Sequence, residues 1–311
     1  MTIVVAGEAL VDLAPRGDQL LPLPGGSPYN VAVGLGRLDR ATAYLGRLSG
    51  DGFGQRLRAR LAEEGVDLAL AEPTDDPTTL AVVHLDDQAR ASYSFYLEAT
   101  AAAGVPDPMP VLPTGAALHV SFGAIGLAHP AGAALAELLL SAARAGHVTS
   151  LDPNVRPSAI ADHDAYVAQL EEVVGHLALV KVSDEDLGLL YPEQDPLEIA
   201  ADWAAQGPAL VVVTRGPDGA VALSGQGRYE EVPGLPVEVV DTVGAGDSFT
   251  SGLLGWLDEH GRLRDRAALE GLAQGTELPA ALRQAVTVAA LTCTRPGADP
   301  PTRAELAAAT D

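Results

Sequence analysis

A glycine-rich turn followed by an acidic residue lies at 237–252, where the sequence reads VEVVDTVGAGDSFTSG. Gly244, Ala245 and Gly246 have almost no side chain, so their backbone N–H groups can converge on an anion where the next helix is expected to begin. Asp247 beside them could accept the proton of an attacking hydroxyl group. This set suits phosphoryl transfer, in which charge sits on the equatorial oxygens of the moving group. The plainer alternative is a strand–helix turn with Asp247 as N-cap.

A second candidate site combines a glycine pair with polar residues in LPGGSPYNVAVGLGRL at 23–38. Gly25 and Gly26 allow the backbone to approach a ligand closely. Asn30 offers a donor and an acceptor early in an expected helix, and Asp12 lies at the end of an earlier expected strand. A carboxylate and an amide together suit a polyhydroxylated ligand. The alternatives are that Asn30 caps the helix and that Asp12 is a solvated turn residue.

Polar residues also follow two expected buried strands, at the edge where open α/β sheets bind ligands. In SLDPNVRP at 150–157, Asp152, Asn154 and Arg156 stand together, and Arg156 could clamp a phosphate bidentately. The alternative is an Asp-Pro-Asn turn. The turn VTRGPDGA at 213–220 contains glycine and could face a nucleotide.

The only lysine of the chain, Lys181, lies in VKVSDEDL at 180–187 and is followed by Ser183 and three acids. Asp186 in this cluster could hold Mg²⁺ directly or through water. The alternative is a capped helix start, with Ser183 as N-cap and the acids in the first turn.

Composition and charge exclude several classes of protein. The 311 residues include 42 acidic and 19 basic ones, a net charge of −23, and no cluster of basic residues, which argues against a nucleic-acid surface or an anionic membrane as partner. No G-x-x-x-x-G-K-[ST] motif is present, so a P-loop NTPase is excluded. Hydrophobic residues make up 47%, which excludes disorder of the whole chain.

Cysteine and histidine usage narrows the chemistry further. Cys293 is the only cysteine, so an internal disulfide and a thiolate zinc site are excluded, and the seven histidines lack zinc-ligand spacing. No apolar run approaches the roughly 18 residues of a membrane span. The start MTIVVAGEALVDL has no basic region of a signal peptide. We therefore expect a soluble, cytoplasmic protein.

The elements that must position these residues alternate between strands and helices. Apolar runs predict strands at 2–6, 41–46, 66–70, 116–121, 148–152, 177–182 and 209–214, followed by shorter ones at 220–224, 228–232 and 237–240. Helical spacing predicts helices at 27–38, 52–64, 130–145, 165–175, 197–205, 245–260, 279–291 and 302–308. This alternation indicates an α/β fold with a mainly parallel central sheet between helices.

Two segments interrupt this rhythm, at about 8–23 and 78–98. Each reads as two strands around a turn, at 15–18 and at 86–89. The two hairpins could form a small accessory sheet, or they could decorate the edges of the main sheet. The absence of linkers favours one domain over 1–311 that carries a β-appendage.

Taken together, these segments resemble the PfkB/ribokinase family of carbohydrate kinases over nearly the whole chain. The motif DTVGAGDSF resembles the family's C-terminal signature, and GGSPYNVAVGLGRL followed by LGRLSGDGFG resembles the N-terminal one. Within the family, GEALVDLAP, FYLEATA, LDPNVRP and VKVSDEDLGLLYP are most similar to bacterial fructokinases.

The resemblance implies a ribokinase-like sheet with a β-lid over a sugar site, and transfer of a phosphoryl group from ATP to the 6-hydroxyl of fructose. It implies Asp247 as base, and an anion hole at Gly244, Ala245 and Gly246. It also implies Mg²⁺, contacted through water near Asp186, K⁺ as an activator, and a possible homodimer through the lid. By this resemblance the sugar site comprises Asp12, Gly25, Gly26 and Asn30. From the residues themselves we add Arg156, which could serve the γ-phosphate or an acidic substrate. Phe95 or Tyr96 of the lid could cover the sugar ring, and of these Tyr96 is assigned to the site. The nucleotide site comprises Lys181, Ser183, Thr214, Arg215, Gly216 and Gly219, and the K⁺ loop Asp241, Val243, Thr292 and Gly297.

The sequence departs from the family pattern at three places. Ser183-Asp184-Glu185-Asp186 replaces the frequent Asn-x-x-Glu, Pro301 stands where some relatives have Ser, and Leu97 replaces a lid arginine of several relatives. The loss of that cation argues against a carboxylated sugar as substrate.

Other functions remain open beside fructokinase. The same family includes kinases of 2-keto-3-deoxygluconate, ribose and nucleosides, and a sensing protein without catalysis could share the fold. A Rossmann dehydrogenase is disfavoured because its first strand should lead into G-x-G-x-x-G, whereas here VVAGEALVD leads into a hairpin.

Overall fold

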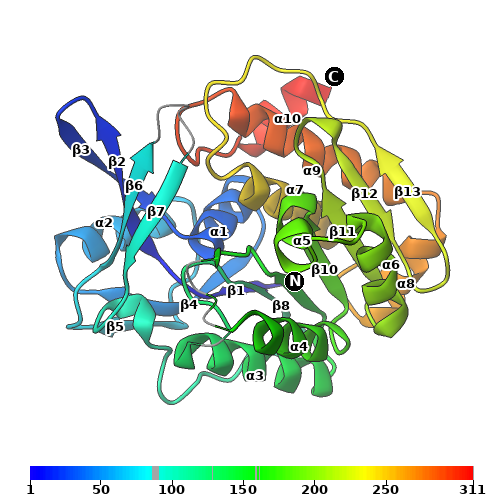
Figure 1. The fold of residues 1–311 in the computed structure, drawn as a ribbon, viewed down its shortest axis with the longest axis horizontal. Helices are drawn as coiled ribbons and strands as arrows, with labels where there is room; N and C mark the ends of the chain where they lie inside the picture. The colour runs from blue at the N-terminus through cyan, green and yellow to red at the C-terminus, as the bar shows by residue number, and fades with distance from the viewer. Residues whose placement is uncertain (86–90, 128, 158–159, 161, 311) are drawn as a thin grey trace.

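The computed structural model describes residues 1–85, 91–127, 129–157, 160 and 162–310 (Figure 1). The turn expected at 86–89 lies outside these residues. The strands are β1 (Ile3–Ala6), β2 (Leu10–Arg16), β3 (Gln19–Gly25), β4 (Thr42–Ser49), β5 (Ala71–Thr74), β6 (Thr79–Leu85), β7 (Ala91–Tyr96), β8 (Ala117–Ser121), β9 (Thr149–Asp152), β10 (Leu179–Ser183), β11 (Leu210–Thr214), β12 (Ala220–Leu223) and β13 (Tyr229–Val232).

The helices alternate with these strands over much of the chain. They are α1 (Ser27–Arg37), α2 (Gly52–Glu63), α3 (Pro130–Arg144), α4 (His163–Val174), α5 (Asp184–Leu190), α6 (Pro196–Gln206), α7 (Ala245–Glu259), α8 (Arg266–Gln274), α9 (Leu278–Cys293) and α10 (Arg303–Thr310), with 3-10 turns η1 (Ala101–Ala103) and η3 (Gly216–Asp218). Within the described residues, none of these helices has both the length and the apolar character that crossing a membrane requires.

The main sheet has nine strands in the described chain, in the order β13-β12-β11-β10-β9-β8-β1-β4-β5. From β11 to β5 neighbouring strands run parallel, and β12 and β13 add an antiparallel edge. Apolar side chains of the parallel strands alternate between two buried faces. In β1, Ile3 and Val5 join one core, and Val4 and Ala6 join the other. The central α/β sheet that the sequence predicts is therefore present.

Helices cover both faces of this sheet (Figure 1). Buried residues of α1, α2, α7, α8 and α9 pack in the core that contains Ile3 and Val5. Buried residues of α3, α4, α5 and α6 pack in the core on the other face. Each helix buries one apolar stripe against the strands, which explains the helical spacing seen in the sequence.

A second sheet has the strand order β3-β2-β6-β7. Two hairpins from distant parts of the chain build it, because β2 pairs with β6 in parallel, with Leu10 opposite Thr79 and Asp12 opposite Ala81. The hairpins thus pair with each other and not with the main sheet. In Figure 1 the second sheet stands at one side of the molecule, in blue and cyan, near α2.

The strand predicted at 66–70 is wrong. This segment makes only an isolated bridge, between Ala43 and Asp67, and then turns. The edge strand β5 begins afterwards, at Ala71, and pairs with the end of β4. Val66 is buried in the core although it belongs to no strand. The apolar character of this segment therefore reflects burial and not strand pairing.

The strand predicted at 237–240 is also absent within the described residues. The backbone there is held by α9 instead, where the Cys293 carbonyl accepts the Val240 amide at 2.8 Å. Helix α8 was not predicted, although Asp265 caps it by accepting the Ala268 amide at 2.7 Å. Its nine residues lie in a polar surrounding sequence that concealed the short apolar stripe.

Candidate active site

Helix α7 begins at the carboxyl edge of the main sheet with Gly244 as its N-cap. Gly244 has a φ of +74°, in the left-handed region, and a Cβ there would lie 2.6 Å from the Cβ of Ala298. Both the turn and the close approach of the loop around Ala298 therefore require glycine. This local geometry places Asp247 in the first turn of the helix.

The start of α7 leaves backbone N–H groups open. The Ala245 amide donates to the Thr242 carbonyl at 3.2 Å. The amides of Gly244 and Gly246 have no hydrogen-bond partner among the described residues, and no side chain caps the helix. Unpaired amides and the positive end of the helix dipole together form an anion-binding site.

The Asp247 carboxylate lies between this helix start and that of α1. Ser27 donates its hydroxyl to Oδ1 at 2.6 Å, and the Asn30 amide donates to Oδ2 at 2.8 Å. Burial raises the pKa of Asp247, and these two hydrogen bonds oppose the rise. A carboxyl group held in this way is oriented and has its basicity increased, as a general base requires.

Helix α1 approaches α7 closely because small residues meet where they cross. A Cβ at Gly34 of α1 would lie 2.4 Å from the hydroxyl oxygen of Ser251 on α7. At the N-cap of α1, Gly26 has a φ of +101°, and a Cβ there would lie 2.7 Å from the carbonyl oxygen of Glu8. These two glycines bring Asn30 to the Asp247 carboxylate.

Asp12 and Gly25 face each other across the β2–β3 hairpin. A Cβ at Gly25 would lie 2.1 Å from Oδ2 of Asp12, so glycine makes room for the carboxylate. Burial and the nearby Asp247 charge raise the pKa of Asp12 to about 6, against the opposing effect of Arg156. Two carboxylates, Asp12 and Asp247, therefore border one region in front of the second sheet.

Aromatic side chains of β7 cover this region. Phe95 lies opposite Ala81 in the register, on the face of the sheet that also carries Asp12, and Tyr93 stacks on Phe95 with ring centroids 5.9 Å apart. Tyr96 was expected to bind the sugar, but the strand alternation places it on the opposite face, where it is 61% exposed. Phe95, not Tyr96, therefore faces the site.

Lys181 and Asp152 form a buried ion pair beneath the start of α7. Nζ of Lys181 lies 2.9 Å from Oδ2 of Asp152, and the two side chains are 5% and 3% exposed. Burial lowers the pKa of Lys181, but the carboxylates of Asp152, Asp186 and Asp247 outweigh it, so the net shift is upward. A Cβ at Gly246 would lie 3.2 Å from this ammonium group. A permanent positive charge therefore lies under the open N–H groups.

Asp186 and Ser183 are both engaged in local structure. The Asp186 carboxylate accepts the Val155 amide at 3.0 Å, and Ser183 caps α5 by accepting the Asp186 amide at 3.0 Å. Burial and Asp152 raise the pKa of Asp186. Since one Asp186 oxygen already binds an amide, a contact to a metal through water fits this residue better than direct ligation.

Arg156 lies at the end of the β9 loop without an ion pair among the described residues. Its guanidinium donates to the Val155 carbonyl at 3.0 Å. Its charge nevertheless lowers the pKa of Glu8, Asp12 and Asp186, so it lies within electrostatic reach of all three. The cation is available to a ligand at this edge.

The expected nucleotide loop is the turn from β11 to β12. The Arg215 amide donates to the Gly219 carbonyl at 2.8 Å, and the Arg215 side chain pairs with Glu231. Gly216 and Gly219 have φ of +50° and +92°. Thr214 ends β11 at the carboxyl edge, so the turn borders the same edge as Lys181 and Ser183.

The expected cation loop is tied together by Asp241. Its carboxylate accepts the Val243 amide at 3.0 Å and the Gly297 amide at 2.7 Å. The bond to Gly297 links the segment before α7 to the loop after α9. Thr292, in the last turn of α9, is buried. The four residues assigned to this loop therefore lie together, with the Asp241 carboxylate already occupied.

Two residues near the site, Ser27 and Glu8, were not predicted from the sequence. Ser27 touches the Asp247 carboxylate, and Glu8 is buried directly behind Asp12 and Arg156. The signal available for Ser27 was its place immediately after the Gly25–Gly26 pair, at the start of a helix. The signal for Glu8 was an acid immediately after a buried strand.

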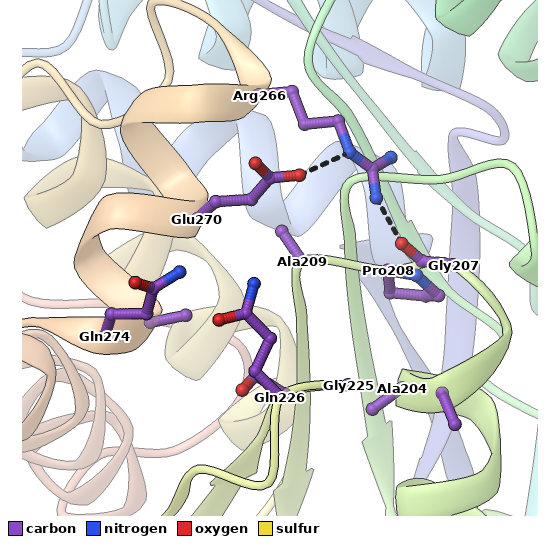
Figure 2. Close-up of a pocket in the computed structure, with 12 residues that line it drawn as sticks. Ala204, Gly207, Pro208, Ala209, Gly225, Gln226, Arg266, Glu270 and Gln274 are labelled. Carbon is purple, nitrogen blue, oxygen red and sulfur yellow. Dashed lines mark hydrogen bonds and ion pairs between the residues drawn. The ribbon is translucent and has the colours of Figure 1, made fainter.

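A surface pocket between α6, α8 and the end of β12 lies away from this site (Figure 2). It borders Ala209, just before β11, and so lies at the amino edge of the parallel strands. Its arginine, Arg266, is used structurally, since it binds Glu270 at 2.9 Å and the carbonyls of Gly207 and Leu177. The pocket thus joins α8 to the sheet.

Among the described residues, no group of three or more His, Cys, Asp or Glu side chains is arranged to hold a metal ion. A carboxylate beside unpaired helix amides, at the carboxyl edge of a doubly covered sheet, suits the transfer of a phosphoryl group to a hydroxyl. Residues 3–305 match the model of the pfkB family carbohydrate kinase. The chain belongs to this family.

Individual relatives are similar over most of the chain. The chain is 38% identical over 262 residues to a fructokinase of Rhizobium leguminosarum bv. trifolii, covering 81% of this chain and 78% of that one. A fructokinase double mutant from Vibrio cholerae O395 in fructose, ADP and potassium ion bound form is 31% identical, with a TM-score of 0.83 over 99% and 97% of the two chains. A fructokinase with bound ATP from Xylella fastidiosa is 29% identical, with a TM-score of 0.87 over 99% and 97%.

Proposed function

We propose that this protein is a fructokinase that transfers the γ-phosphoryl group of ATP to the 6-hydroxyl of D-fructose. The observation that carries the proposal is the Asp247 carboxylate, fixed by Ser27 and Asn30 one residue from the unpaired Gly246 amide. This pairing supports a base and an anion site within one helical turn. The choice of fructose as the substrate rests on the relatives that are named fructokinase.

In the proposed mechanism, the sugar hydroxyl donates a hydrogen bond to Asp247. Its oxygen attacks the γ-phosphorus while its proton passes to the carboxylate. As the new O–P bond forms, the bond from phosphorus to the bridging oxygen breaks, and ADP leaves with the electron pair. Amides at Gly244 and Gly246 stabilise the negative charge of the moving group, and Lys181 beneath them adds a positive potential.

The sugar lies, in this proposal, between the second sheet and the start of α1. The second sheet acts as a lid: Asp12 accepts hydroxyl hydrogens and Phe95 gives apolar cover. Gly25 and Gly26 keep backbone close to the ring. Among the described residues, Arg156 is a cation within electrostatic reach of Asp12, and it is the reason to include a sugar acid as the competing substrate.

ATP occupies the carboxyl edge from the start of α7 to the turn at Thr214–Gly219. Its phosphates point to the unpaired amides, and Arg215, Gly216 and Gly219 border the nucleoside. Mg²⁺, when bound, would carry part of the phosphate charge, and Asp186 would hold it through water. The net charge of −23 does not oppose ATP binding, since the positive groups here are local.

K⁺ is proposed as an activator beside the anion site, held by main-chain carbonyls of Asp241, Val243, Thr292 and Gly297. The Asp241 carboxylate already accepts two amides, and the carbonyls of Thr292 and Gly297 accept the amides of Arg295 and Asp299, so each of these groups would bind K⁺ through a remaining lone pair. The turnover number should rise when K⁺ replaces Na⁺ at fixed ionic strength. An equal rate in both salts would leave the loop a structural link only.

A homodimer through the lid is proposed from the outer face of the second sheet. Tyr96 is 61% and Leu20 51% exposed, and both lie on the face turned away from Asp12. Sedimentation equilibrium should give a dimer that Tyr96→Glu weakens. A monomer at micromolar concentration would contradict this part.

The test of the function is a sugar panel with ATP and Mg²⁺. We expect a higher kcat/KM for fructose than for 2-keto-3-deoxygluconate, ribose or adenosine.

Asp12→Ala should lower kcat/KM for fructose by a factor that corresponds to about 2–4 kcal/mol of transition-state stabilisation, while ATP binding persists. Since burial raises the pKa of Asp12 to about 6, kcat/KM should fall as pH decreases through that value, because the protonated carboxyl loses an acceptor. A preference for the sugar acid that Arg156→Ala abolishes would exclude fructose and retain the kinase.

A further inference from the structure

Glu8 is a buried carboxylate that the mechanism above does not use. It follows β1 and is 5% exposed. Its two oxygens are divided between adjacent amides of the segment after β8: Oε1 accepts Ala124 at 3.1 Å and Oε2 accepts Ile125 at 3.0 Å. Both bonds are buried and join residues more than 110 positions apart.

The segment that Glu8 holds forms the floor beneath the lid. Ala124 is buried against Leu10 and Ala81 of the second sheet, and Phe95 packs on the same cluster. The displacement of this segment would therefore move the apolar cover of the proposed sugar site.

Backbone geometry around Glu8 is shaped to accept its carboxylate. Gly123 has a φ of +145°, and a Cβ there would lie 2.8 Å from Oε1 of Glu8. Gly26, at the start of α1, could not carry a Cβ without approaching the Glu8 carbonyl to 2.7 Å. Glu8 thus contacts the floor segment through its side chain and the start of α1 through its backbone.

Charged and titratable groups face Glu8 from each neighbouring element. Burial raises its pKa to about 7, the amides of Ala124 and Ile125 and the charge of Arg156 oppose the rise, and Asp12 adds to it. Tyr44 of β4 is a further titratable neighbour, and burial together with Glu8 raises its pKa. Protonation of Glu8 would turn one of its oxygens into a hydroxyl, which is a weaker acceptor than a carboxylate oxygen, so the ionised form binds the two amides more strongly.

We propose that Glu8 is a positioning residue for sugar binding, whose ionised carboxylate fixes the segment around Ala124 and Ile125 under the lid. This inference rests on the proposed function, since it concerns the sugar side of the same site. Loss of the carboxylate charge weakens the bonds to these amides, loosens the floor and weakens sugar binding. The phosphoryl-transfer groups at α7 stay in place.

The test compares wild type with Glu8→Gln, and Glu172→Gln, an exposed site on α4, serves as the control. Glu8→Gln should raise the KM for fructose by about fivefold to 150-fold, the range for one unsatisfied buried amide, while kcat and the KM for ATP stay unchanged. In wild type this KM should also rise as pH decreases through about 7, a step that Glu8→Gln removes, leaving only the Asp12 step at lower pH.

An unchanged KM in folded Glu8→Gln, or a fall in kcat alone, would overturn the inference. Wild type without activity on fructose would instead refute the proposed function. If Glu8→Gln does not fold, hydrogen exchange of wild type decides. Protection of the Ala124 and Ile125 amides, corrected for intrinsic exchange, should fall as Glu8 protonates, and constant protection would overturn the proposal.

Discussion

Helices α7 and α5 begin on either side of Lys181 and leave their first turns in opposite states. In α5 the Ser183 hydroxyl accepts the Asp186 amide at 3.0 Å, and three acids fill the first turn. In α7 a glycine in the left-handed conformation takes the N-cap, no side chain caps the helix, and one acid follows. One helix start is already neutralised, and the other is open to an incoming anion.

The difference explains where a transferring phosphate belongs. Capping by a side chain satisfies orphan amides at the time of folding, so nothing remains for a ligand. At α7 the amides of Gly244 and Gly246 stay unpaired in the described structure, above the Lys181 ammonium. The helix start that lacks a capping side chain is thus the reactive one, and the capped start is structural.

The largest effect is expected at Asp247, the acid of the open helix start. Asp247→Asn removes the proton acceptor and should lower kcat by about 10²–10⁴-fold. ATP affinity should persist, because the unpaired amides remain. Asp202→Asn, an exposed position on α6, is the matched control and should have no effect. Steady-state kinetics and ATP titration measure both, and near-normal turnover of folded Asp247→Asn would remove the assignment.

The second effect concerns the ion pair between the two helix starts. Lys181→Met leaves the Asp152 carboxylate buried and unpaired, which should lower the free energy of unfolding by about 3–5 kcal/mol. Arg144→Met breaks an exposed pair with Glu137 and should cost only about 0–1 kcal/mol. Urea denaturation distinguishes them. Equal small losses of unfolding free energy in both variants would mean that the charge of Lys181 does not stabilise the buried Asp152 carboxylate.

Two glycines give the third test. Gly246 of α7 has the Lys181 ammonium 3.2 Å from where its Cβ would be, whereas Gly188 of α5 has nothing within 4 Å. Gly246→Ala should displace the phosphate or the ammonium group and lower kcat by about tenfold to a hundredfold. Gly188→Ala should leave kcat unchanged and stabilise the protein by about 0.4–1 kcal/mol. An equal response of kcat at both positions would contradict the contrast.

Periodicity was enough to predict most of the main sheet, because its strands are buried on both faces and read as continuous apolar runs. It failed at 237–240, where Val239 and Val240 are each 59% exposed and their apolar character does not come from a core. It also failed at 66–70, where Val66 is buried but the pairing with β4 resumes only at Ala71. An apolar run in the sequence therefore does not by itself show that the segment pairs as a strand or is buried.

The residues of the candidate site were also predicted only in part. Asp247 and its glycines were predicted because local sequence determines a helix start. Glu8 and Ser27 were missed because their partners are distant: Glu8 binds Ala124, and Ser27 binds Asp247, 220 residues away. Of the two lid aromatics considered, Phe95 and Tyr96, the assigned one lies on the exposed face, because alternation along a strand gives two faces without saying which is inside. Phe95 takes the inner face because Asp12 and Ala81 lie in register with it.

The smallest effect is expected at Ser183, where the resemblance implies nucleotide binding and the structure shows a helix cap. Ser183→Ala removes the acceptor of the Asp186 amide and should lower the free energy of unfolding by about 1 kcal/mol. The KM for ATP and kcat should stay unchanged, because α5 offers no open amide to the phosphates. Ser27→Ala is the matched serine at α1: it removes a donor to Asp247 and should lower kcat more than stability. Denaturation and ATP kinetics on both variants decide. A rise in the KM for ATP in Ser183→Ala, without loss of stability, would assign the hydroxyl to the nucleotide and make both helix starts part of the phosphate site.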